Sequence, residues 1–103
     1  MGLLKEQRDE NNILTENGFE HKSSSVTCQL DDCYEKYIRV GPYDAWIAVN
    51  TETSNVCIYV EYACGGEVAT CTHSLKNSWD DDPDDFFEEL DDFATSILEH
   101  YTY

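Results

Sequence analysis

The chain has 103 residues, of which 22 are Asp or Glu and 6 are Lys or Arg, giving a formal charge of −16 at pH 7. This charge argues against direct binding to nucleic acid or to an anionic membrane surface. A hydrophobic share of 41%, with 13% aromatic residues, argues equally against a disordered chain. We therefore expect one folded domain spanning residues 1–103.

The N-terminal region, from residue 2 to about residue 17, predicts a helix. Its leucines, Leu3, Leu4 and Leu14, fall on one stripe, and the residues from Lys5 to Asn12 are polar. Gly18 can adopt the left-handed conformation that ends a helix, with Phe19 folding back onto Leu14. The sequence therefore marks the end of this helix more clearly than its start.

The middle of the chain predicts an antiparallel sheet of four to five strands, joined as a meander. Residues 21–25 are expected to form a polar connector before it. Segments rich in β-branched and aromatic residues alternate with period two at Val26–Leu30, Tyr34–Val40, Tyr43–Asn50, Val56–Tyr62 and Glu67–His73. Turn residues separate these segments at Asp31-Asp32, Gly41-Pro42, Thr51–Asn55 and Gly65-Gly66. Such short connections favour hairpins between neighbouring strands.

The alternation gives the expected sheet two different faces. One face is aliphatic and suits a covering helix. The other carries Tyr37, Trp46 and Tyr59 together with some charge. These aromatic residues are either cross-strand pairs that stabilise an open face or anchors of an interface with another protein.

An acidic stretch follows Trp79. Nine of the 13 residues from position 80 to position 92 are acidic and none is basic: Asp80, Asp81, Asp82, Asp84, Asp85, Glu88, Glu89, Asp91 and Asp92. Asp82 fits the N-cap of a helix, and Pro83 fits its first position. The apolar residues that follow recur at helical spacing opposite the acids. We expect an acidic amphipathic helix from Pro83 to about His100, packed on the aliphatic sheet face. The order of helix, antiparallel sheet and helix predicts an α+β fold of two layers.

The charge density of this stretch approaches that of duplex DNA. A short turn and a helix spread the nine acids over about 20 Å, against about one phosphate charge per 1.7 Å of duplex. No Lys alternates with the acids, as it commonly does on a helix face that serves only solubility. The pattern predicts a surface that imitates nucleic acid, with a merely solubilising face as the alternative.

The same stretch fits a calcium site poorly. Asp80, Asp82, Asp84 and Asp91 fall at positions 1, 3, 5 and 12 of a calcium-loop register. Position 6 lacks the required glycine, and Pro83 starts a helix inside the supposed loop. We therefore expect no metal and no cofactor in this stretch.

The chain contains five cysteines behind an N-terminus that turns polar at Lys5, without a signal peptide or an apolar run of membrane-spanning length. We interpret them as reduced, structural thiols of a cytoplasmic protein. They lack the paired spacing of zinc fingers. A zinc site assembled across strands and a disulfide between Cys64 and Cys71 remain alternatives.

Catalytic motifs are missing from the sequence. There is no nucleophile-elbow serine, no phosphate-cradling glycine loop and no metalloprotease helix motif. The three histidines, His21, His73 and His100, are scattered along the chain. Carboxylates in open solvent also lack the separated pKa values that acid–base catalysis requires. We expect a non-enzymatic protein.

The segment Lys76-Asn77-Ser78-Trp79-Asp80, followed by more acids and by Asp85-Phe86-Phe87, resembles a known family. It is similar to the small acidic phage anti-CRISPR proteins that inhibit type II RNA-guided nucleases. Those proteins share the order of an N-terminal helix, a short antiparallel sheet and acidic C-terminal helical segments. Here the acid run is shorter, and five cysteines are present. The resemblance implies a role for five acids at the start of this stretch. They would occupy the pocket in which the nuclease reads the short duplex motif beside its DNA target: Asp80, Asp81, Asp82, Asp84 and Asp85.

Two hypotheses account for these patterns. The first is a phage-encoded, non-enzymatic inhibitor in the host bacterial cytoplasm, whose nine acids enter the nucleic-acid channel of a basic defence nuclease. It would contact neither nucleic acid nor membrane directly. The second is an acidic adaptor or regulatory module that binds a protein partner through Tyr37, Trp46 and Tyr59.

Overall fold

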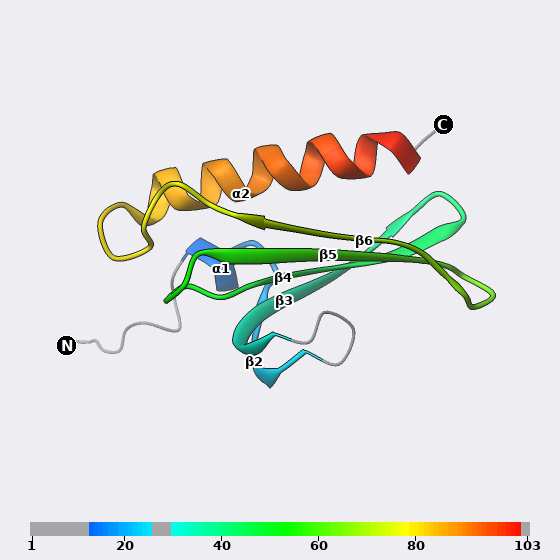
Figure 1. Cartoon of the computed structure of the whole chain (residues 1–103), viewed down its shortest axis with the longest axis horizontal. Coiled ribbons are helices and arrows are strands. Elements are labelled where there is room, and N and C mark those ends of the chain that lie inside the picture. Colours follow the sequence, from blue (N-terminus) through cyan, green and yellow to red (C-terminus); the bar gives the residue numbers. More distant parts are fainter. Residues whose placement is uncertain (1–12, 26–29, 102–103) are drawn as a thin grey trace.

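A computed structural model describes residues 13–25 and 30–101 of the chain. Its elements are α1 (Ile13–Glu16), β2 (Glu20–Ser24), β3 (Asp31–Val40), β4 (Tyr43–Val49), β5 (Asn55–Tyr62), β6 (Glu67–Ser74), α2 (Pro83–Leu98) and a 3₁₀ turn (Glu99–Tyr101). Each strand pairs antiparallel with the next, in the order β2-β3-β4-β5-β6. The predicted α+β class and the meander are confirmed (Figure 1).

Helix α1 ends with the predicted glycine. Gly18 has a φ of +94°, and its N–H donates to the carbonyl of Thr15 at 3.2 Å. The N–H of Phe19 donates to the carbonyl of Leu14 at 3.0 Å, and both of these side chains are buried in the core. The two hydrogen bonds satisfy carbonyl groups at the end of the helix. Residues 2–12 of the predicted helix lie outside the described residues.

The edge of the sheet differs from the sequence prediction. The predicted connector at residues 21–25 is wrong, because Glu20–Ser24 forms strand β2, paired with β3. The predicted turn at Asp31-Asp32 is also wrong, because both residues open β3. Of the strand predicted at Val26–Leu30, residues 26–29 lie outside the described residues and Leu30 is not in a strand. All five residues of β2 are exposed, so this polar edge strand has no alternation that a sequence pattern could reveal.

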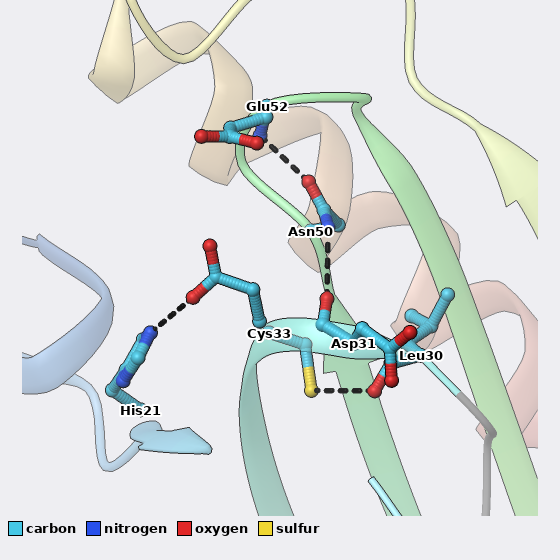
Figure 2. A network of polar contacts seen from close by, with 7 residues as sticks. His21, Leu30, Asp31, Cys33, Asn50 and Glu52 are labelled. Carbon is cyan, nitrogen blue, oxygen red and sulfur yellow. Dashed lines mark hydrogen bonds and ion pairs between the residues drawn. The ribbon is translucent and has the colours of Figure 1, made fainter. Parts of the chain in front are cut away.

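An asparagine at the end of β4 holds the start of β3 in place. Asn50 Nδ2 donates to the backbone carbonyl of Asp31 at 2.9 Å, and Asn50 Oδ1 accepts from the N–H of Glu52 at 2.8 Å (Figure 2). Asp32 has a φ of +50°, and its carboxylate lies 2.6 Å from His21 Nε2 on β2. These long-range contacts explain why two turn-like residues belong to a strand.

The core lies between the aliphatic sheet face and the apolar side of α2. Alternate residues of two central strands join four α2 residues in one cluster: Ala45, Ile47, Val49, Val56, Ile58 and Val60 with Phe86, Leu90, Ala94 and Leu98. Figure 1 shows α2 running along the sheet. The four helix residues are spaced four apart, so they form a single buried stripe. No helix within residues 13–25 and 30–101 is long and apolar enough to cross a membrane.

Part of the aliphatic face stays open beside the helix. A groove with a volume of about 450 Å³ lies between α2 and β3. Ile38 and Val40 line it on the strand, and Leu90 and Leu98 line it on the helix. Helix α2 is therefore bordered by this largely apolar groove, which Asp91 and Glu99 also line, and by solvent on its opposite side.

Candidate functional site

The acidic helix begins as its sequence predicts. Asp82 is the N-cap, with extended backbone, and its Oδ1 accepts from the N–H of Asp85 at 3.1 Å. Pro83 occupies the first turn, where its missing N–H leaves no hydrogen bond unmade. The preceding turn is fixed by Trp79, whose ring packs edge-on against Phe86 with 5.4 Å between centroids. The acids before and after Pro83 therefore belong to one connected, folded surface.

Eight of the nine predicted acids are exposed, and together they define what we call the acidic strip: Asp80, Asp81, Asp82, Asp84, Asp85, Glu88, Asp91 and Asp92. Asp84, Glu88 and Asp92 are four residues apart on α2, so their side chains follow one another along the same side of the helix. Within the described ranges 13–25 and 30–101, no Lys, Arg or His forms an ion pair with a carboxylate of the strip.

The ninth acid, Glu89, is partly buried and points into the fold. Its carboxylate accepts from the backbone N–H of Lys76 at 2.9 Å, and from the N–H and the Nδ2 of Asn77 at 3.0 Å each. Desolvation acts to raise the pKa of Glu89, but these hydrogen bonds, with the charge of His73, outweigh it and lower the pKa. Glu89 thus connects α2 to the loop after β6.

Repulsion within the strip acts on the carboxyl group of Asp85. The neighbouring charge of Asp82 is the largest cause that raises the pKa of Asp85 above its usual value, followed by desolvation, a hydrogen bond with Asp82 and the charge of Asp84. Folding thus holds these carboxylates at separations where they repel one another. This repulsion lowers the stability of the folded state.

The three predicted aromatic residues form a continuous row on the other face of the sheet. In the register of the strands, Tyr37 lies opposite Trp46, and Trp46 lies opposite Tyr59. The ring centroids are 5.3 Å apart for the first pair and 5.8 Å for the second. We call Tyr37, Trp46 and Tyr59 the aromatic row.

Carboxylates hold the outer rings of this row. The hydroxyl of Tyr37 donates to Asp44 at 2.6 Å, and the hydroxyl of Tyr59 donates to Glu61 at 3.2 Å. The hydrogen bond to Asp44 is the main cause that raises the pKa of Tyr37, with desolvation and the charge of Asp44 adding to it. Tyr37 is nevertheless 51% exposed, so the row remains accessible.

Three pairs of opposed acids lie on this face and were not predicted from the sequence. Glu20 lies opposite Glu35, Asp44 opposite Glu61, and Glu61 opposite Glu67. Like charges in directly opposite positions destabilise a sheet. These pairs depend on the exact register of neighbouring strands, which includes the unpredicted strand β2 and a register shift at Val60/Glu61.

The cysteines give no sign of a metal centre in the described part of the chain. No group of three or more His, Cys, Asp or Glu residues is placed to hold a metal ion within residues 13–25 and 30–101. Cys64 and Cys71 are free thiols and do not form the alternative disulfide. Cys33 and Cys57 are buried in strands β3 and β5.

The geometry thus offers two surfaces on different sides of the sheet, the acidic strip and the aromatic row. Comparison with protein-family models, with curated proteins and with solved structures finds no significant match for this chain.

Proposed function

We propose that this chain is a non-enzymatic inhibitor whose acidic strip imitates DNA and occupies the nucleic-acid-binding site of a basic protein. The observation that carries the proposal is the strip itself: eight exposed carboxylates on one folded turn and helix. Helix α2 has 16 residues, which corresponds to a length of about 24 Å. This length matches roughly two-thirds of a turn of duplex DNA, at about 3.4 Å per base pair.

The mechanism is competition for cationic side chains. Arginine and lysine residues that would bind phosphate oxygens pair instead with the carboxylates of the strip. A fixed helix presents these charges without the ordering cost that a flexible acidic tail would carry. The net charge of −16 adds long-range attraction to a basic channel.

The resemblance around Trp79 narrows the proposed target to a guide-loaded type II RNA-guided nuclease, and with it the source to a phage acting in the bacterial cytoplasm. Asp80 and Asp81 in the turn, with Asp82, Asp84 and Asp85 at the helix start, form the end of the strip that would enter the site for the short duplex motif. The remaining acids, Glu88, Asp91 and Asp92, extend the charge and steer the approach.

The test is displacement of a labelled target duplex from a panel of such nucleases. Two triple variants each remove three negative charges, so both have a formal charge of −13 in place of the −16 of the wild type. Asp81→Asn/Asp84→Asn/Asp92→Asn changes the strip, while Glu16→Gln/Asp31→Asn/Glu52→Gln changes exposed acids elsewhere. We expect the strip variant to displace DNA at least about tenfold less effectively and the control to match the wild type. Equal losses in both variants, or no displacement by the wild type, would contradict the proposal.

A further inference from the structure

We infer that the aromatic face of the sheet binds an arginine side chain of a protein partner, between the aromatic row and the Glu20–Glu35 pair. This site is separate from the acidic strip and does not depend on it. The register places Glu20 of β2 opposite Glu35 of β3. Glu35 lies two residues before Tyr37 on β3. Residues two apart on a strand point to the same face. The carboxylates and the rings therefore share one surface.

A hollow already exists at this position. It has a volume of about 260 Å³ and is lined by Gly18, Glu20, Lys22, Glu35, Tyr37 and Trp46. A water molecule has a share of about 30 Å³ in the liquid, so the hollow has space for a side-chain head group of several heavy atoms. Its walls combine two aromatic rings with two carboxylates.

The charge of this face favours a cationic occupant. Around the aromatic row the face carries Glu20 and Glu35 on one side, and Asp44, Glu61 and Glu67 on the other. Two cations of the described strands lie on this face, and each is paired with one acid: Lys22 with Glu20 and Arg39 with Asp44, at 3.7 Å each. The five carboxylates outnumber these two cations, so a further positive group on the face would lower the repulsion between opposed carboxylates.

The lysine already at the hollow does not close it. Lys22 Nζ lies 3.7 Å from Glu20 Oε1, and both side chains are well exposed. An exposed pair of this kind contributes little free energy and can rearrange when a partner binds. Ser25 donates to the other acid of the pair, Glu35, and so helps to fix its position.

Arginine fits this surface better than lysine does. Its planar guanidinium stacks on aromatic rings and can donate two parallel hydrogen bonds to a carboxylate. The half-exposed ring of Tyr37 and the neighbouring ring of Trp46 offer the stacking surface. The two glutamates offer the acceptors.

The two tryptophans allow a direct test, because each reports on one surface. Trp46 belongs to the aromatic row, and Trp79 lies beside the acidic strip. The full chain is titrated with acetyl-Gly-Arg-Gly-amide, and the indole N–H signals of both tryptophans are followed by NMR. The control peptide replaces arginine with citrulline, which has the same shape without the charge. We expect a saturable shift of the Trp46 signal with the arginine peptide alone.

Matched variants locate the site. Glu20→Gln/Glu35→Gln should weaken the response of Trp46 at least about tenfold, and Asp84→Asn/Glu88→Gln on α2 should leave it unchanged. Thermal unfolding of each variant checks that the fold is intact. The inference is overturned if only Trp79 responds, if citrulline acts like arginine, if no saturable shift occurs, or if the α2 variant loses the response. None of these results bears on displacement of DNA by the acidic strip.

Discussion

Carboxylates form the acidic strip and also border the aromatic row, but they have different roles in the fold at the two surfaces. On the strip, the acids extend into solvent, and repulsion by Asp82 raises the pKa of Asp85. On the sheet face, Asp44 and Glu61 accept hydrogen bonds from the hydroxyls of Tyr37 and Tyr59. Apart from the Asp82 carboxylate, which caps α2, charge on the strip is therefore separable from the fold, whereas charge beside the row also positions the rings. The predictions below test this difference.

Loss of the shared core should remove both surfaces together. Phe86 is fully buried at 0% exposure, under the strip and against the sheet. Phe86→Ala should lower the free energy of unfolding by about 3–5 kcal/mol, measured by chemical denaturation. The adjacent Phe87 is only partly buried, so Phe87→Ala should cost clearly less. Equal losses for the two variants would contradict the described orientation of α2.

Glu89 should behave as part of the fold, although its sequence neighbours belong to the strip. Glu89→Ala removes the acceptor for the backbone N–H groups of Lys76 and Asn77 and should cost about 1–3 kcal/mol in the free energy of unfolding. The matched change Glu88→Ala, at an exposed position, should leave stability nearly unchanged. A similar loss in both variants would place Glu89 with the strip instead.

The pH dependence of this contribution follows from the lowered pKa of Glu89. A carboxyl with a lowered pKa in the folded state stabilises the fold above its unfolded pKa, near 4.5. The contribution disappears as the pH falls through the folded pKa. The stability difference between wild type and Glu89→Ala should therefore be full near neutral pH and shrink below about pH 4.5, as measured by denaturation at several pH values. A difference independent of pH would contradict the ionised role of Glu89.

Ionised Asp85 should destabilise the fold, in contrast to Glu89, and its effect on stability should be the smallest of those predicted here. Its pKa is raised in the folded state, so its ionisation opposes folding above the folded pKa. Asp85→Asn removes the charge and leaves its backbone N–H, which binds the Asp82 cap, in place. We expect slightly higher thermal stability at neutral pH, and no gain below the usual Asp pKa of 3.8. A lower stability at neutral pH would contradict repulsion within the strip.

Local sequence patterns predicted what local chemistry determines. Asp82 and Pro83 mark the start of α2, and Gly18 marks the end of α1, because caps act within a few residues. Alternation in β4 and β5 indicated the aliphatic face, because every second residue of these strands joins the core, although Ala48 and Cys57 are buried on the other face as well. The aromatic row was predicted as a set of residues, and the register then made it continuous.

Contacts between residues that are distant in sequence could not be predicted, for physical reasons. Strand β2 is exposed on both faces, so only its pairing with β3 identifies it. Asn50 is 19 residues from Asp31, whose carbonyl it binds. Glu89 looked like its acidic neighbours because its partners, Lys76 and Asn77, lie in the loop before the helix. Each case depends on tertiary structure that composition does not encode locally.

The most direct test of the acidic strip is the salt dependence of its affinity for a guide-loaded type II nuclease. We predict that the logarithm of the affinity falls steeply with the logarithm of the salt concentration, since exposed charge pairs are screened. The strip variant Asp81→Asn/Asp84→Asn/Asp92→Asn should flatten this slope and weaken binding at low salt. The control variant Glu16→Gln/Asp31→Asn/Glu52→Gln should keep the wild-type slope and the wild-type affinity at low salt. An affinity that does not depend on salt, or one that the two variants change equally, would contradict imitation of DNA by this surface.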